Sequence, residues 1–293
     1  SKLPDSVGAY YATYTQLLGY KSDSDEWKVM ALATAPHDAK KVKEYSEKIR
    51  STISQAGISP RLDSKFYNTL SPWEDHLYTK NLAELLDRPD SVGTDLTRDW
   101  QINVACAMQM VICDYVMTAI RDLGQRYQSP FDNICLSGGF FMNCVFNGEL
   151  DRSGLYENVF ISQSPADLGN AIGSAMYVSE NILSANKPLV QKAKQSLYTG
   201  QSLSDDPSTI LSRYQITHKK FDNRHDLADK LCPYIREGKV ISIIEGKSEF
   251  GERALGHRSI IANPSDKAMK DTINAKIKYR EDYRPFVPIC LQS

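Results

Sequence analysis

The most informative residues lie in a glycine-rich basic segment between Glu245 and Ser259. Three cations lie there among three glycines, and four more follow downstream: Lys247, Arg253 and Arg258, then Lys276, Lys278, Arg280 and Arg284. Arginine offers a planar fork to two phosphate oxygens, and lysine a compact charge. Arginines separated by glycine and aromatic residues are more typical of phosphate binding than of a solvated basic surface. Both stretches therefore predict phosphate binding.

A second candidate site follows the apolar run that ends at Leu136, where Ser137 leads into Gly138 and Gly139. Backbone without Cβ can approach a phosphate or ribose closely, and its N–H groups can bind anions. Asn143 and Asn147 are four residues apart, so on a helix their amides would share one face and could meet a nucleotide. The alternative interpretation is a tight turn with a capping asparagine.

Asp167 lies in another turn, between a short apolar run and a helix rich in small residues. A carboxylate at such a position can ligate a hard metal ion or cap the helix that follows. The residues alone leave both interpretations open.

Short apolar runs that alternate with helical patterns place these residues in an α/β protein. Helices are predicted around 7–14, 26–33, 37–50, 96–121, 171–175 and 227–236, and strands at 131–136, 159–162 and 240–244. Residues 51–75 mix turn formers with varied polarity and receive no assignment. The polar region 185–220 predicts a boundary between two domains.

The composition argues against some classes of binding partner. The formal net charge is −1, with 24% charged residues, which gives no bulk attraction for nucleic acid or anionic membrane. No uninterrupted apolar stretch approaches the roughly 20 residues that span a bilayer. The six cysteines form no CxxC pair and are expected to be free thiols in a reducing cytoplasm.

Taken together, these segments resemble one family, the O-carbamoyltransferases of nodulation-factor and antibiotic biosynthesis. Five segments carry the resemblance, in the family's order and over nearly the whole chain. Glu26 to Ala33 is similar to the family's EYKVMGLA segment, and Ser137 to Gly148 is similar to its AGG-VALNC-VANG string. Ser164 to Gly169 is similar to an acidic DAG turn. Gly246 to Ser259 is similar to GRMEFGPRALGNRS, and Arg280 to Phe286 is similar to REPWRPF.

The resemblance implies two modules. Residues 1–195 would be the C-terminal part of an actin-like ATPase module of the ASKHA type, as in threonylcarbamoyl-transfer enzymes, and residues 208–293 the N-terminal part of a YrdC-like module. The second module would join carbamoyl phosphate and ATP, with Mg²⁺, to give carbamoyl-adenylate and pyrophosphate. The first would transfer the carbamoyl group to a hydroxyl of a small-molecule acceptor, assisted by a divalent metal, with iron as one option.

Carried over residue by residue, the family assigns three roles. Lys247, Arg253 and Arg284 would be catalytic, and with Arg258, Lys278 and Arg280 they would hold carbamoyl phosphate and the ATP phosphates. Ser137, Gly138, Gly139 and Asn143 would bind the adenylate. Asp167 would be a metal ligand. The expected protein is cytoplasmic, with no nucleic-acid or membrane partner and with a homodimer left open.

The chain also departs from the family. The family's HxxxH histidine pair, which completes its metal site, has no counterpart here, and Phe140 and Phe141 replace smaller residues. The match resembles a fragment that lacks the first half of one module and the second half of the other, so this chain alone is expected to be inactive. Two other functions stay open: a nucleotide-binding regulatory module without transferase activity, and a tRNA threonylcarbamoyl-modifying enzyme.

Overall fold

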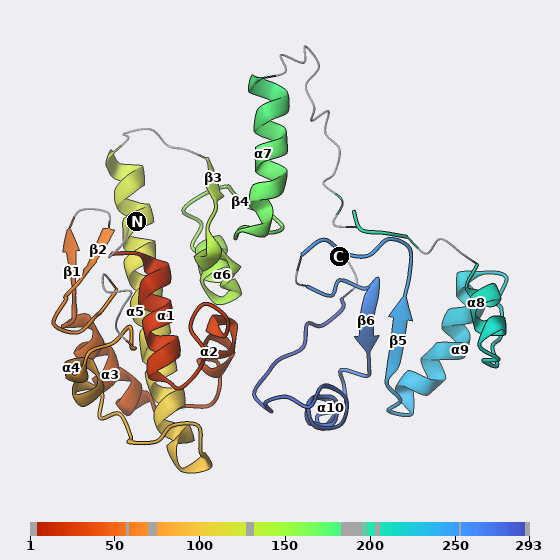
Figure 1. Ribbon diagram of the computed structural model, residues 1–293, viewed down its shortest axis with the longest axis horizontal. Coiled ribbons are helices and arrows are strands. Elements are labelled where there is room, and N and C mark those ends of the chain that lie inside the picture. The colour runs from red at the N-terminus through yellow and green to blue at the C-terminus, as the bar shows by residue number, and fades with distance from the viewer. Residues whose placement is uncertain are drawn as a thin grey trace. The chain divides into compact units, whose positions relative to one another are not determined.

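The computed structural model describes residues 5–56, 59–69, 75–126, 132–182, 196, 198–202, 206–251 and 253–290. The chain divides into two units, Ser1–Gly169 and Asn170–Ser293. The expected end of the first module, residue 195, lies outside the described residues. Each unit is described by itself, and Figure 1 labels the elements of both.

The first unit is built around one long helix, α5 (Arg98–Arg126). The other helices of its N-terminal part are α1 (Val7–Leu17), α2 (Glu26–Leu32), α3 (Ala39–Arg50) and α4 (Lys80–Leu85), with a short 3₁₀ turn, η1 (Asp95–Thr97), before α5. Helices α1, α2 and α3 all contact α5. Tyr10 of α1 is fully buried, and its hydroxyl donates to the carbonyl oxygen of Met108 on α5 at 3.0 Å. These helices confirm the helical predictions for 7–14, 26–33, 37–50 and 96–121.

Helix α5 is long and apolar enough, by length and composition, to cross a membrane. However, 72% of the apolar stretch of this helix is buried within the protein. Its apolar residues therefore form the core of this unit, although polar residues interrupt them along the sequence.

A βαβα unit completes the first half of the fold. Strand β3 (Asn133–Leu136) leads through a 3₁₀ turn, η2 (Gly139–Met142), into α6 (Cys144–Arg152), and β4 (Asn158–Ile161) then leads into α7 (Leu168–Asn181). The two strands pair in parallel, with Leu136 opposite Ile161. Strands alternating with helices confirm the predicted α/β class, and helix α7 crosses the boundary between the two units.

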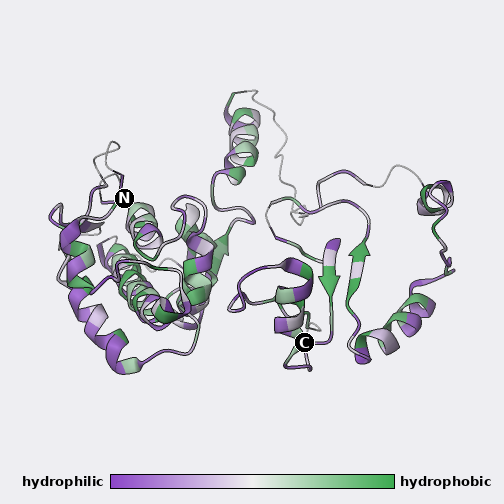
Figure 2. Ribbon diagram, turned by 60° about the horizontal axis from the view of Figure 1, so that its bottom comes forward, coloured by the Kyte–Doolittle hydropathy of each residue, from purple (hydrophilic) through white to green (hydrophobic). Residues whose placement is uncertain are grey.

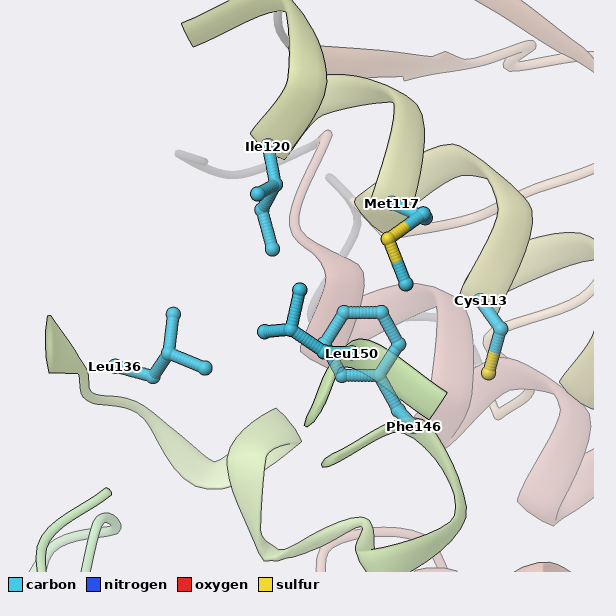
Figure 3. Close-up of a cluster of buried hydrophobic side chains, with 6 residues drawn as sticks. All are labelled: Cys113, Met117, Ile120, Leu136, Phe146 and Leu150. Atoms are coloured by element: carbon cyan, nitrogen blue, oxygen red, sulfur yellow. The ribbon is translucent and has the colours of Figure 1, made fainter. Parts of the chain in front are cut away.

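One apolar cluster joins these elements (Figure 3). It combines side chains of α5, β3 and α6: Cys113, Met117, Ile120, Leu136, Phe146 and Leu150. Phe146 is fully buried at its centre. This cluster fixes the end of β3, where the predicted glycine turn begins.

The second unit contains helices α8 (Pro207–Arg213) and α9 (Arg224–Arg236), and strands β5 (Ile241–Ile244) and β6 (Arg258–Ile261). It ends with α10 (Met269–Ile273) and a single π-helical turn, η3 (Asn274–Lys278). The strands are antiparallel, with Ile244 opposite Arg258, and β5 is green along most of its length in Figure 2 because three of its four residues are isoleucine. Helix α9 and strand β5 confirm the predictions for 227–236 and 240–244.

The segment that received no assignment contains an antiparallel hairpin, β1 (Ile53–Ala56) with β2 (Ser59–Leu62). Its residues are not apolar enough to predict strands. The pairing depends on contacts with distant parts of the chain: Tyr115 of α5 donates to the carbonyl oxygen of Ile53 at 3.2 Å, and the Leu62 N–H donates to Asp5 at 2.9 Å.

Candidate functional site

The glycine turn begins where β3 ends. Ser137, Gly138 and Gly139 are exposed, and Gly138 has φ of 117°, a backbone conformation that glycine adopts without strain. The Gly138 N–H donates to the carbonyl oxygen of Pro165 at 2.8 Å. Because the strands are parallel and in register, this bond joins the turn after β3 to the turn after β4. The structure therefore brings the predicted adenylate-binding turn and the Asp167 turn together.

Asn143 is the capping asparagine of a tight turn, which was the alternative to nucleotide binding. It is 5% exposed and caps α6: its Oδ1 accepts from the N–H groups of Val145 and Phe146, both at 3.2 Å. Its Nδ2 donates to Gln109 on α5 at 3.1 Å. The side chain thus holds the end of the glycine turn against the core.

The residue behind Asn143 is Gln109, which the sequence analysis did not identify. The Gln109 Oε1 also accepts from the Tyr11 hydroxyl at 2.9 Å, and its Nε2 donates to the Cys113 Sγ at 3.1 Å. Burial raises the pKa of the Cys113 thiol to about 12, so this group stays neutral. A buried polar chain therefore connects α1, α5 and α6 beneath the turn.

Two phenylalanines of the turn complete the packing. The rings of Phe140 and Phe141 lie 5.1 and 6.0 Å from the ring of Phe146, centroid to centroid. They also meet each other edge to face at 5.5 Å. These two departures from the family pattern are thus partly buried against the apolar cluster.

Asn147 does not share the partner of Asn143. Its Nδ2 donates to the carbonyl oxygen of Phe141 at 2.7 Å, whereas its Oδ1 is buried without a hydrogen-bond partner among the described residues. The two amides that the sequence predicts on one helix face therefore have different partners: Asn143 caps α6, and Asn147 bonds the backbone of η2.

Asp167 is exposed in the turn that precedes α7. Two residues later, a Cβ on Gly169 would lie 2.1 Å from the carbonyl oxygen of Ser164, so this position requires glycine. No group of three or more His, Cys, Asp or Glu side chains able to hold a metal occurs in the described part of the chain. Asp167 alone does not fit a metal centre.

In the second unit, the basic loop connects β5 to β6. Lys247 and Arg253 are exposed. The Arg258 guanidinium instead donates to three backbone carbonyls: those of Glu245 at 2.7 Å, His257 at 2.9 Å and Gly246 at 3.1 Å. Arg258 therefore braces the loop from within.

Glu249, a residue with no role predicted from the sequence, complements this brace. Its Oε1 accepts from the N–H groups of Leu255 at 3.0 Å, His257 at 2.8 Å and Arg258 at 2.9 Å. Desolvation opposes ionisation of this carboxyl, but the backbone hydrogen bonds outweigh it and lower the pKa of Glu249 to about 2.

A segment before α8 also contacts this loop. The Tyr198 ring stacks on His257 with centroids 3.6 Å apart, and its hydroxyl donates to the carbonyl oxygen of Leu255 at 2.9 Å. The Gly200 N–H donates to the carbonyl oxygen of Ser248 at 3.0 Å, and the Ser248 N–H donates to the carbonyl oxygen of Gln201 at 3.2 Å. Residues 198–201 thus form one wall of the loop.

The second basic stretch turns around Asn274, which is 1% exposed. Its Nδ2 donates to the carbonyl oxygens of Asp282 at 3.3 Å and Arg284 at 3.0 Å, and its Oδ1 accepts from the Arg280 Nε at 2.7 Å. Arg280 also lies 4.6 Å from the centre of the Phe286 ring. Burial, and next the charge of Arg284, lower the pKa of Arg280.

Asn274 thereby gathers two of the predicted phosphate ligands on one turn. The Nη1 of Arg284 lies 3.6 Å from the Glu281 carboxylate, and Lys278 is exposed at the end of η3. Nothing in the sequence around Asn274 predicted that this residue orders the second basic stretch.

These features define a class: an α/β protein with a glycine turn at the carboxyl ends of two parallel strands and an arginine-containing loop between two antiparallel strands. Comparison with known families identifies the group. Residues 1–176 match the carbamoyltransferase N-terminus and residues 232–293 the carbamoyltransferase C-terminus. The chain belongs to the carbamoyltransferase family.

Individual relatives agree with this assignment. The chain is 31% identical to nodulation protein NolO of Bradyrhizobium diazoefficiens over 291 residues, which cover 99% of this chain and 49% of that protein. It is 31% identical to nodulation protein NolNO of Sinorhizobium fredii, covering 99% of this chain and 39% of the relative. An uncharacterized protein of Synechocystis sp. is 31% identical, with 98% and 46% covered. The chain thus spans about half the length, or less, of these relatives.

Proposed function

We propose that the full-length protein is an ATP-dependent O-carbamoyltransferase. Carbamate, released from carbamoyl phosphate by one water with loss of phosphate, attacks the α-phosphorus of ATP and expels pyrophosphate. The resulting carbamoyl-adenylate then gives its carbamoyl group to a hydroxyl of a small-molecule acceptor, and AMP leaves. The observation that carries this proposal is the match of one chain to both the N-terminal and the C-terminal parts of the carbamoyltransferase family.

The second unit would perform adenylation as the start of a YrdC-like module. Lys247 and Arg253 are exposed on the basic loop, and Lys278 is exposed on the other stretch. Together with Arg280 and Arg284 they would neutralise the phosphates of carbamoyl phosphate and MgATP, a step that is mainly positioning and electrostatics. Arg258 would contribute by holding the loop, since its guanidinium already bonds three carbonyls.

The first unit would receive the adenylate as part of an actin-like module. Ligands of α/β sheets bind beyond the carboxyl ends of the strands, and Ser137, Gly138 and Gly139 are exposed there. Asn143 would support this turn from below. A divalent metal would supply Lewis-acid polarisation of the carbamoyl carbonyl. Asp167 alone among the described residues does not fit such a centre, so the roles proposed here are those of the chain's own residues.

Pyrophosphate release tests the proposal. The full-length protein is incubated with ATP, carbamoyl phosphate and Mg²⁺, and wild type is compared with Lys247→Ala and Arg284→Ala. We expect release that requires carbamoyl phosphate and falls by roughly 100-fold in both variants, because each removes a charge that stabilises the transition state. Lys239→Ala, which removes an exposed cation before β5, is the matched control and should retain activity.

Two outcomes would overturn the proposal. Nucleotide binding without pyrophosphate release would favour a regulatory module. Salt-dependent binding of tRNA, coupled to modification of that RNA, would favour a threonylcarbamoyl-transfer enzyme.

A further inference from the structure

We propose that Glu249 is the positioning residue of the basic loop, holding it closed so that Lys247 and Arg253 face an incoming phosphate. This role rests on the function proposed above, and it concerns a residue that binds backbone rather than substrate.

The geometry of the loop carries the inference. One carboxylate oxygen of Glu249 accepts N–H groups from Leu255, His257 and Arg258, at 2.8 to 3.0 Å. The carboxylate therefore ties the start of the loop to its last residues and to the first residue of β6. Arg253 lies inside the closed segment and is exposed.

Arg258 makes the complementary half of this clasp. The carboxylate of Glu249 satisfies backbone donors, while the guanidinium of Arg258 satisfies the backbone acceptors of Glu245, Gly246 and His257. Hydrogen bonds to charged groups are stronger than those between neutral groups. The two side chains thus order both strands of the loop entrance.

The loop requires such a clasp because its backbone is intrinsically permissive. Gly246, Gly251 and Gly256 have φ of 46°, 92° and 102°, in the region where glycine is favoured. Glycine loses more conformational entropy on ordering than other residues. Without the clasp, Lys247 and Arg253 would sample many positions, and binding a phosphate would carry the cost of ordering them.

The negative charge of Glu249 is compatible with phosphate binding by the loop. A carboxylate among cations would normally weaken their positive field. Here the bonded oxygen is directed at backbone N–H groups, which hold the carboxylate ionised with a pKa of about 2. The negative charge is thereby compensated inside the loop, and exposed Lys247 and Arg253 supply the outward charge.

The first experiment measures the loop without any substrate. Hydrogen exchange of residues 255–258, followed by mass spectrometry of the full-length protein, is compared among wild type, Glu249→Ala, Glu249→Gln and Glu237→Ala. We expect exchange to accelerate by about tenfold or more in Glu249→Ala. Glu249→Gln, which keeps an acceptor oxygen, should be closer to wild type. Glu237, an exposed carboxylate at the end of α9, is the control and should change nothing. Unchanged protection in Glu249→Ala would overturn the clasp.

The second experiment measures steady-state pyrophosphate release. A positioning role predicts that Glu249→Ala, assayed well below its melting temperature, raises the KM for carbamoyl phosphate by about tenfold with a smaller loss of kcat, and that Glu249→Gln restores most of the affinity. Equal KM values in wild type and Glu249→Ala would refute the positioning role while leaving the transferase intact. Absence of release in wild type would refute the transferase itself, and the positioning role would fall with it.

Discussion

Asn143 and Glu249 act in the same way at different sites: each offers a side-chain oxygen to two or more backbone N–H groups. Asn143 accepts from Val145 and Phe146 at the start of α6, and Glu249 accepts from three amides of the basic loop. Buried or crowded backbone donors without partners are costly, so these bonds fix the conformation of each turn. The residues expected to bind ligand depend on them.

Asn143→Ala is expected to lower the free energy of unfolding by about 1–3 kcal/mol, because it removes a helix cap and leaves Gln109 without one donor. Denaturant unfolding of the full-length protein measures this. Asn170→Ala, an exposed asparagine on α7, is the control. Loss of ATP affinity at unchanged stability would instead show that Asn143 contacts the nucleotide directly.

The Glu249 carboxylate gives a pH-dependent signal. Its pKa is lowered from 4.5 to about 2, so its contribution to folding is full above pH 4.5 and is lost as pH falls through about 2. The NMR shift of the Leu255 amide should therefore stay constant from pH 7 down to about pH 3. It should show no titration at all in Glu249→Gln. A midpoint near 4.5 would mean that the backbone bonds do not hold the carboxylate.

At the scale of elements, the two turns after β3 and β4 form one structure. The Gly138 N–H bonds the Pro165 carbonyl oxygen, and Gly169 approaches the backbone of Ser164. A movement of either turn alone would strain or break the bond between Gly138 and Pro165. The Asp167 turn therefore helps to set where the glycine turn can meet a ligand.

Gly169→Ala tests this coupling. Its Cβ would lie 2.1 Å from a backbone oxygen that cannot rotate away, so we expect a loss of about 1–3 kcal/mol in unfolding free energy and a shifted glycine turn. Gly173→Ala on the same helix is the matched control. Its Cβ would meet nothing within 4 Å, and the change should be neutral or stabilising by up to about 1 kcal/mol. Equal stability of the two variants would contradict the required glycine.

Elements with strong local patterns could be predicted from sequence. The apolar runs before Ser137 and Ser162 predicted β3 and β4, and helical spacing predicted α5. The β1–β2 hairpin could not be predicted, because its residues are of mixed polarity and its order depends on distant contacts with α5 and Asp5.

The same limit applies to the candidate sites. Glycines and arginines mark both turns in the sequence, whereas Gln109 and Asn274 acquire their roles only through partners that the fold brings near. The role of Glu249 is harder still to predict, since a carboxylate within a basic segment carries a charge that opposes phosphate binding. The assignments of Lys247, Arg253, Arg284 and Asp167 to chemistry stay predictions.

At the scale of the whole molecule, the chain combines segments that match both parts of one family within about half the length, or less, of its relatives. Each unit has its own internal support for a candidate site: a buried amide network in the first and a charged clasp in the second.

The stacking of Tyr198 on His257 bears on how the second unit could be excised for separate study. A Cβ on Gly200 would lie 2.0 Å from the Ser248 hydroxyl oxygen, so the incoming chain fits closely against the loop. A recombinant piece that starts at residue 208 would retain β5 and β6 yet lose this wall, exposing one side of the loop to solvent. The natural cut point for an isolated domain therefore lies ahead of Tyr198.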